Sequence, residues 1–449
     1  MADGLAALRA VEAELTRRWP ESRIEPSLTR IAALVDLLGS PQRCYPVLQV
    51  AGTNGKTSVA RMLDALLTRL SLRVGRYTSP HLQSITERIS LDGAPISAER
   101  FVETYRDIEQ YVALVDAGSA VPMSTFEVLT GMAFAAFADA PVDAAVVEVG
   151  LGGGWDATNV ADAAVAAITP IAVDHVNYLG SDLAGIAAEK AGIIKPGSIA
   201  VLAAQPPEVL AAITARSVEV DATVAREGLE FGVLHRAVAV GGQQLKLQGL
   251  GGAYDEIFLP LHGEHQARNA ALALAAAEAF FGAGPRRSLD AEAVRDALAT
   301  VTVPGRLERV RSAPSVFLDS AHNPHGARAL AAALRQEFAF RRLVAVVGVL
   351  RDKDAQGILA ELQPVVSAVV ITTNSSPRAM DVEELAALAR EVIGADRVQV
   401  EPRLPEAVEA AVTMAGEPGA DGVCVAGVVI TGSVITAGEA RTLFGREPW

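Results

Sequence analysis

Apolar and polar residues alternate along this chain in patterns that predict strands and helices in regular succession. Short apolar runs, as at 47–51 and 143–149, are typical of buried strands, whereas apolar residues three to four positions apart, as at Val59, Met62 and Leu66, are typical of amphipathic helices. In the first part of the chain we expect strands at 47–51, 72–78, 143–149, 163–169 and 199–203, β-structure at 229–258, and helices at 5–18, 28–38, 98–114, 124–138, 182–192 and 266–282. Such alternation predicts a parallel sheet with helices on both faces.

The pattern is interrupted at 282–285, where Gly-Ala-Gly-Pro marks the start of an interdomain region with a helix at 290–300. The alternation resumes at Val316. From there we expect strands at 316–319, 343–349, 368–372, 397–400 and 422–426, and helices at 325–337, 354–361, 382–392 and 404–415. The chain is therefore predicted to be an α/β protein, with a larger parallel-sheet domain at 1–300 and a smaller, doubly wound, Rossmann-like domain at 301–449.

Composition and charge narrow the classes of protein. The chain has 39 basic and 53 acidic residues and a net charge of −14, which argues against a general nucleic-acid binder. Its two cysteines, Cys44 and Cys424, lie far apart in sequence and are interpreted as buried thiols in a reducing compartment. The apolar stretch at 128–149 is broken by two aspartates and a proline, so it is not expected to span a membrane. No secretory signal opens the chain, and we expect a cytoplasmic protein.

The strand at 47–51 runs directly into a turn that predicts a phosphate-binding loop. The loop residues are Gly52, Thr53, Asn54, Gly55, Lys56, Thr57 and Ser58. Backbone N–H groups at the start of the following helix would face a polyphosphate, and Lys56 would reach its outer phosphates. Only five of the 39 basic residues are lysines, which favours a chemical role for Lys56 and for Lys190. A glycine-rich turn without a ligand is the alternative.

Polar residues also follow two other predicted strands. Glu148 comes after the apolar run of the strand at 143–149, in the position of a Mg²⁺ ligand opposite a phosphate loop. Asp174 and His175 follow the strand at 163–169. Because the carboxyl ends of parallel strands share one edge of a sheet, these side chains are expected near the loop. A capping carboxylate and a structural histidine are the alternatives.

Several motifs occur in order and together resemble one family. They are the phosphate loop, TSPHL with TERI (78–82 and 86–89), EVGLGGGWDATN (148–159), DH (174–175), EKAGI (189–193), HQARNAALA (265–273), PGRLE (304–308) and DSAHNPHG (319–326). From about residue 25 to its C-terminus the chain resembles folylpolyglutamate synthases, which are often also dihydrofolate synthases, in the Mur ligase superfamily.

This resemblance implies a Mur ligase-type ATP-binding domain at 1–300 and a glutamate ligase domain at 301–449. The enzyme would add L-glutamate to the terminal glutamate carboxylate of tetrahydrofolates. That carboxylate would attack the γ-phosphate of ATP to give an acyl phosphate, and the amine of glutamate would displace the phosphate. The implied cofactors are ATP, Mg²⁺ at two sites and K⁺, and the implied partners are a folate or pteroate and L-glutamate. No nucleic acid or membrane is expected, and the chain is expected to be a monomer.

Motif matching also implies individual roles. The implied catalytic residues are Lys56, Lys190, Arg306 and His322, and the implied nucleotide contacts are the phosphate loop, Asn269 at the adenine, Arg306 at the transferred phosphate, and Asp319. The implied Mg²⁺ ligands are Ser79, Glu148, His175 and Lys190, the last as a carbamate. The implied substrate contacts are Phe126, Arg88 and Asp156. For Phe126, which could stack on a pterin, an ordinary core phenylalanine is the alternative.

The sequence departs from the family at two places and leaves some questions open. Gly154 and Trp155 stand where the folate enzymes often have Arg-Leu, and a threonine at position 57 is closer to the motif of the peptidoglycan Mur ligases. One rival is a Mur-type ligase acting on a cell-wall precursor. Against it, the about 50 residues that precede the phosphate loop are fewer than a separate domain usually has. A nucleotide-dependent switch protein is another. Acceptance of dihydropteroate stays open. The residues that would bind the glutamate substrate also stay open, and the candidates are Arg351, Lys353, Ser375 and Ser433.

Overall fold

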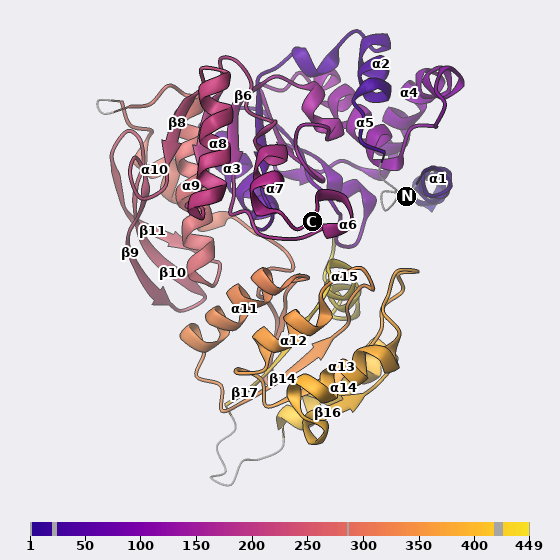
Figure 1. Ribbon diagram of the computed structural model, residues 1–449, viewed down its shortest axis with the longest axis vertical. Coiled ribbons are helices and arrows are strands. Elements are labelled where there is room, and N and C mark those ends of the chain that lie inside the picture. The colour runs from indigo at the N-terminus through magenta and orange to yellow at the C-terminus, as the bar shows by residue number, and fades with distance from the viewer. Residues whose placement is uncertain (1, 20–24, 285–286, 417–424, 449) are drawn as a thin grey trace.

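The computed structural model describes residues 2–19, 25–284, 287–416 and 425–448, and three sheets organise it (Figure 1). The first sheet has eight strands in the order β4-β3-β2-β5-β1-β6-β7-β8. They are β1 (Val47–Ala51), β2 (Val74–Tyr77), β3 (Ile89–Leu91), β4 (Ala94–Pro95), β5 (Ala144–Glu148), β6 (Ala163–Ile168), β7 (Ile199–Leu202) and β8 (Thr223–Arg226). All pairs from β2 to β8 are parallel, so β1, β5 and β6 end at one edge.

Helices cover both faces of this sheet because successive residues of its strands point to opposite sides. On one face, Leu48 and Val50 pack against α3 (Lys56–Arg69), α9 (Glu264–Phe280) and α10 (Ala291–Thr300). This core also includes the antiparallel second sheet, formed by β9 (Gly232–Ala239), β10 (Gly242–Gln248) and β11 (Ala253–Leu259). On the other face lie α1 (Ala2–Thr16), α2 (Thr29–Leu37), α4 (Ala98–Gly118), α5 (Thr125–Asp139), α7 (Leu183–Ala191) and α8 (Pro207–Glu219).

The third sheet belongs to a second α/β unit, drawn in orange and yellow in Figure 1. Its strand order is β12-β13-β17-β14-β15-β16, parallel except for β12. The strands are β12 (Glu308–Ser312), β13 (Ser315–Leu318), β14 (Arg342–Val347), β15 (Ala368–Ile371), β16 (Val398–Val400) and β17 (Ala426–Thr431). One face packs on α11 (Pro324–Glu337), α12 (Ala355–Leu362) and α13 (Val382–Ile393), the other on α14 (Leu404–Gly416) and α15 (Val434–Leu443).

The α/β class, the parallel first sheet and the doubly wound second unit are as the sequence predicts. Two predictions are wrong. The last strand is Ala426–Thr431 and not 422–426, of which 422–424 lie outside the described residues. Cys44 is an exposed free thiol, because it follows the short helix η1 (Pro41–Arg43) at the surface; Cys424 lies outside the described residues. No helix in the described part of the chain has the length and apolar character needed to cross a membrane.

Candidate active site

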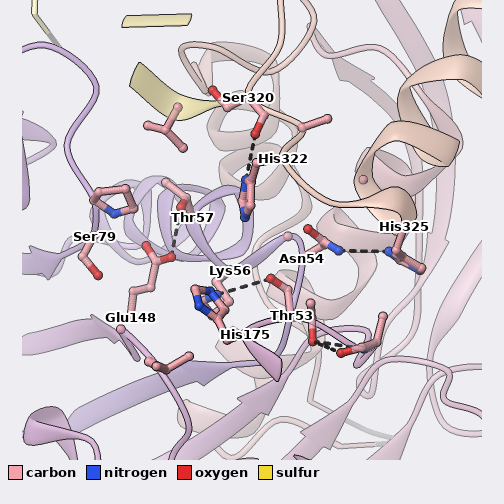
Figure 2. A pocket seen from close by; sticks show the side chains of 18 of the residues that line it. Thr53, Asn54, Lys56, Thr57, Ser79, Glu148, His175, Ser320, His322 and His325 are labelled. Atoms are coloured by element: carbon pink, nitrogen blue, oxygen red, sulfur yellow. Dashed lines mark hydrogen bonds between the residues drawn. The ribbon is translucent and has the colours of Figure 1, made fainter. Parts of the chain in front are cut away.

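A cavity of about 1420 Å³ lies where the carboxyl ends of β1, β5 and β6 meet the second unit. The phosphate loop lines it from the first unit, and Arg306, Asp319 and His322 line it from the linker and the second unit. Figure 2 shows loop residues, Glu148 and His175 on one side and His322 and His325 on the other. Residues far apart in sequence thus share one cavity, as parallel strand ends and domain interfaces allow.

The phosphate loop connects β1 to α3, which begins at Lys56. Gly52 and Gly55 have φ values of 138° and 93°, which disfavour other residues. A Cβ at Gly52 would lie 1.9 Å from the Thr169 hydroxyl oxygen, so the loop also has no room for a side chain there. The Thr53 hydroxyl donates to the Ala172 carbonyl (2.9 Å) and accepts from its N–H (3.0 Å), which ties the loop to the segment after β6.

Lys56 is held inside this loop. Its ammonium donates to the Thr53 carbonyl at 3.4 Å (Figure 2). Burial lowers the pKa of Lys56, and the Glu148 and Asp174 carboxylates oppose that shift. A bound polyphosphate would add several negative charges and favour the ammonium form. This is the arrangement in which a loop lysine neutralises outer phosphates.

Glu148 ends β5 opposite the loop, and its two carboxylate oxygens differ. Oε1 accepts a hydrogen bond from the Thr57 hydroxyl at 3.0 Å (Figure 2), whereas Oε2 is buried and has no hydrogen-bond partner. Burial raises the pKa of the Glu148 carboxyl, against the opposing charge of Lys56. An orphaned buried carboxylate oxygen fits a hard divalent cation, which would supply the missing partner. Ser79 lies beside this carboxylate (Figure 2).

No group of three or more His, Cys, Asp or Glu side chains with metal-binding geometry occurs among the described residues. A Mg²⁺ at Glu148 would therefore depend on hydroxyl, phosphate and water oxygens, as Mg²⁺ commonly does beside phosphates. His175 directly precedes α6 (Val176–Leu179), and its Nε2 lies 3.5 Å from the Lys353 ammonium. Burial and that charge lower the pKa of His175 to about 3, so its imidazole is neutral and able to bind a cation.

Asp174 makes several of the contacts between the two units. Its carboxylate accepts from the Lys353 ammonium (2.7 Å) and the Asn323 amide (2.8 Å), and His322 Nε2 lies 3.6 Å away. Burial alone would raise the pKa of Asp174, but the His322 contact and the Lys353 charge hold it well below its ordinary range. Sequence reasoning had drawn attention to Asp174 but assigned a role only to His175.

Arg306 and Asp319 are coupled through the linker to the second unit. Asp319 Oδ2 accepts from the Leu307 N–H (2.9 Å) and Oδ1 from the Ala321 N–H (2.9 Å). Asp319 thereby fixes the backbone next to Arg306, whose guanidinium lines the cavity. His322 donates from Nδ1 to the Ser320 carbonyl at 2.9 Å, since a carbonyl can only accept, and this contact orients its ring (Figure 2).

Lys190 is buried near the glycine-rich segment that follows β5. A Cβ at Gly153 would lie 2.8 Å from Lys190 Cα, so only glycine lets this segment pack on α7. Glu189 fastens the segment by accepting from the Gly153 (3.2 Å) and Trp155 (3.1 Å) N–H groups. Burial, with the Lys56 charge, lowers the pKa of Lys190 to about 7. A large fraction of this amine is therefore neutral near pH 7.

The predicted folate contacts line one end of the cavity together with Trp155. The Phe126 ring lies 5.9 Å from that of Tyr77 and is half-buried, so it is neither a fully buried core residue nor a free surface one. Arg88 donates from Nε to His81 at 2.9 Å. Asp156 accepts from the N–H groups of Leu151 and Thr158 (both 2.9 Å), which makes it a support of the loop as well as a lining residue. Their substrate roles stay predictions.

Most, but not all, of the remaining predicted contact residues line the cavity. Asn269 lies against the phosphate loop, because a Cβ at Gly55 would be 2.8 Å from its Oδ1; its adenine contact stays a prediction. Of the four glutamate candidates, Arg351, Lys353 and Ser433 line the cavity, and Ser375 is not among the described lining residues. The Ser433 hydroxyl caps α15 by accepting from the Thr436 N–H.

Fold and site together define an ATP-dependent ligase with two α/β units around one cavity, and comparison with known proteins agrees. The model of the Mur ligase middle domain matches residues 50–277, and that of the Mur ligase glutamate ligase domain matches 305–429. The chain is 61% identical to the dihydrofolate synthase/folylpolyglutamate synthase of Mycobacterium tuberculosis, over 99% of this chain and 96% of that protein. It is 35% identical to the Bacillus subtilis enzyme of the same name, over 82% of this chain and 87% of that protein.

Solved structures show the same similarity. Folylpolyglutamate synthase of M. tuberculosis, complexed with ADP and AMPPCP, superposes with a TM-score of 0.95 at 60% identity, over 99% of this chain and all of that one. Escherichia coli FolC, in complex with DHPP and ADP, superposes with a TM-score of 0.84 at 30% identity, over 98% of this chain and 97% of that one. The chain belongs to the Mur ligase family, in its dihydrofolate synthase/folylpolyglutamate synthase branch. These relatives support the folate interpretation and not the cell-wall alternative.

Proposed function

We propose that this protein uses ATP to join L-glutamate to the terminal glutamate carboxylate of tetrahydrofolates, and that it also accepts dihydropteroate. The observation that carries the proposal is the single cavity in which the phosphate loop faces Arg306 and His322. The names of the relatives support the substrate class, since the M. tuberculosis, B. subtilis and E. coli proteins are named for both activities.

In the proposed reaction the folate carboxylate attacks the γ-phosphorus of ATP, and the bond to the ADP oxygen breaks. The amine of glutamate then attacks the acyl carbon, loses a proton, and expels inorganic phosphate. Lys56 and Arg306 would neutralise the transferred phosphoryl group from opposite sides of the cavity. Preorganised charges of this kind lower the barrier because they need not reorient during the reaction.

The proposed cation sites follow from the donor groups. Glu148, Thr57 and Ser79 would hold one Mg²⁺, and Glu148 with the neutral His175 a second. The ions would neutralise phosphate charge. K⁺ is proposed as a further cofactor. The domain limits at 1–300 and 301–449, a monomeric state and a cytoplasmic location are part of the same proposal. The family matches at 50–277 and 305–429 agree with the division.

Lys190 is proposed to act as a carbamate. Its neutral amine would attack CO₂, forming an N–C bond and releasing one proton, and so turn a cation into an anion. Burial of the amine supports this step, because only the unprotonated form reacts. The carbamate oxygens would then be hard ligands for Mg²⁺.

An ADP-release assay tests the proposed function. Purified protein is given ATP with dihydropteroate, tetrahydrofolate or its one-carbon forms, each with and without L-glutamate. We expect release that requires both the pteridine substrate and glutamate. Release with neither substrate would favour a switch protein, and the absence of release with every pteridine would contradict the proposal. Complementation of a host without dihydrofolate synthase decides the second activity alone.

A further inference from the structure

Asp174 lies at the centre of the contacts between the two units, and its environment is unusual for a carboxylate. It follows β6 in the first unit, yet its strongest partners come from the second unit. Asp174 and the Lys353 side chain are both more than nine-tenths buried, with exposed fractions of 9% and 6%. While the units are together, removal of one partner of such a buried pair is costly, because the other charge is then left buried without its partner.

Asn323 adds a second connection whose direction is fixed by the fold. Its Oδ1 caps α11 by accepting from the Gly326 N–H at 2.8 Å. Its Nδ2 must therefore point the other way, where it donates to Asp174 Oδ2 (2.8 Å) and to Asn54 Oδ1 (3.2 Å). The helix cap thus determines which face of the amide meets the first unit.

Asn54 extends the network into the phosphate loop itself. Its amide nitrogen donates to Asn323 Oδ1 (3.2 Å) and lies 3.0 Å from His325 Nδ1 (Figure 2). Asn54 and Asp174 are therefore two points of one surface that receives the 322–325 segment and Lys353. The surface lies on the first unit, where hydrogen bonds between Thr53 and Ala172 tie the two segments together.

We propose that Asp174 is a positioning residue that fastens the second unit onto the phosphate loop, and so brings His322 and Arg306 to the nucleotide. This inference rests on the proposed function for its kinetic consequences, but its structural part does not. In the separated state the Asp174 carboxylate and the Lys353 ammonium would each be hydrated. On closure each replaces water with the other, so the pair favours the one docked geometry that satisfies both.

The first experiment measures closure without relying on activity. One label is placed on the exposed Cys44 and a second on Glu391→Cys, which is exposed on α13, with Cys424 replaced by serine. The label distance is measured with and without a nonhydrolysable ATP analogue. We expect a short, narrow distribution for the parent protein and a longer or broader one for Asp174→Asn. The same distribution in both proteins would overturn the inference.

The second experiment separates docking from chemistry by a double-mutant cycle. Lys353→Met leaves the Asp174 charge buried without its partner, and the double variant Asp174→Asn with Lys353→Met removes both charges. We expect the double variant to dock better than Lys353→Met alone, because no orphaned charge remains. Strictly additive effects on the label distance would mean that the pair does not fasten the units.

Kinetics give the third measurement and its control. Asp174→Asn is expected to lower kcat by about tenfold or more while the Kd of a fluorescent ATP analogue changes by a smaller factor, because the phosphate loop lies in the first unit and only Arg306, Asp319 and His322 would reach the nucleotide from the linker and the second unit. Asp255→Asn breaks an exposed Asp–Lys pair (2.8 Å) away from the cavity and should change neither. Equal losses in kcat and nucleotide affinity would overturn the inference. If the parent protein has no ligase activity, the proposed function fails, whereas the label distances still test Asp174.

Discussion

The two oxygens of Glu148 lead to a prediction in which stability and activity change in opposite directions. Glu148→Gln keeps the size of the side chain and can keep the hydrogen bond from Thr57, but it removes the charge. In the protein without nucleotide, Oε2 has no partner, and burial raises the pKa of Glu148 against the attraction of Lys56 and the contacts with Thr57 and the Ser79 backbone. The neutral variant is therefore expected to be more stable than the parent protein when neither metal nor nucleotide is present.

The magnitude follows from the cost of a buried polar atom without a partner. Such an atom costs about 1–3 kcal/mol, and a charged one is at the upper end. A glutamine amide at the same place is also unpaired but neutral, so we expect a gain of about 1–2 kcal/mol. Activity should fall by about 10²–10³, equivalent to about 3–4 kcal/mol, because a preorganised charge at the reacting phosphates is lost.

The sign of the pH dependence gives a further check. Because the folded protein has the raised pKa, the stabilising contribution of protonated Glu148 is complete below about 4.3, the ordinary value. It is lost as the pH rises through the pKa of the folded state. The stability advantage of Glu148→Gln should therefore grow from acidic to neutral pH. The addition of Mg²⁺ and ATP should reverse it, since they would stabilise the parent protein more.

Calorimetric unfolding and the ADP-release assay measure the two effects, and Glu278→Gln is the matched control. Glu278 is fully buried, but its oxygens accept from the Gly251 N–H (3.0 Å) and the Tyr254 hydroxyl (2.8 Å) and from Leu250. In Glu278→Gln the amide nitrogen would face N–H or O–H donors, so this control should lose stability and keep activity. A Glu148→Gln protein that is less stable than its parent at neutral pH, or that keeps its activity, would refute the reasoning.

Three other predictions concern the same cavity. Lys56→Ala should fold normally and lose about 3–4 kcal/mol of transition-state stabilisation; near-normal ADP release would show that the phosphate-loop assignment is wrong. Lys190→Ala should be nearly inactive and regain some activity with acetate, and the parent protein should lose activity in CO₂-free buffer; activity unaffected by CO₂ would argue against a carbamate. A nonhydrolysable ATP analogue should reduce the radius of gyration in small-angle scattering, and binding without compaction would contradict closure.

The features that the sequence predicted well are local ones. The phosphate loop depends on β1, two glycines and the start of α3, all within 12 residues that are contiguous in the chain. Glu148 was placed correctly at a strand end because the apolar run before it is unambiguous and parallel strands end at one edge. Alternation of apolar runs and helical spacing likewise determined the layers of both units.

The features that it missed depend on distant segments. β17 lies in the middle of the second unit's sheet although it is the last strand in the sequence, and the glycines at 419 and 422 before it and at 427 within it weaken its apolar pattern. The partners of Asp174 come from about 150 and 180 residues further along, and no periodicity reports such a contact. The His-Asn-Pro run within 319–326 indicated that this segment has a functional role, but it did not indicate that the segment contacts Asp174.

Several of the contacts that join the two units are polar. Besides the Asp174 network, Gln83 of the first unit donates to Thr442 (3.0 Å) and accepts from Arg441, both in the second unit. Polar groups can exchange these partners for water when the units separate, so opening costs much less than exposing an apolar core of similar area. The same groups dock in only one geometry. An interface with paired charges and amides is therefore expected to favour one closed geometry and still to open readily, which the scattering and label-distance measurements test.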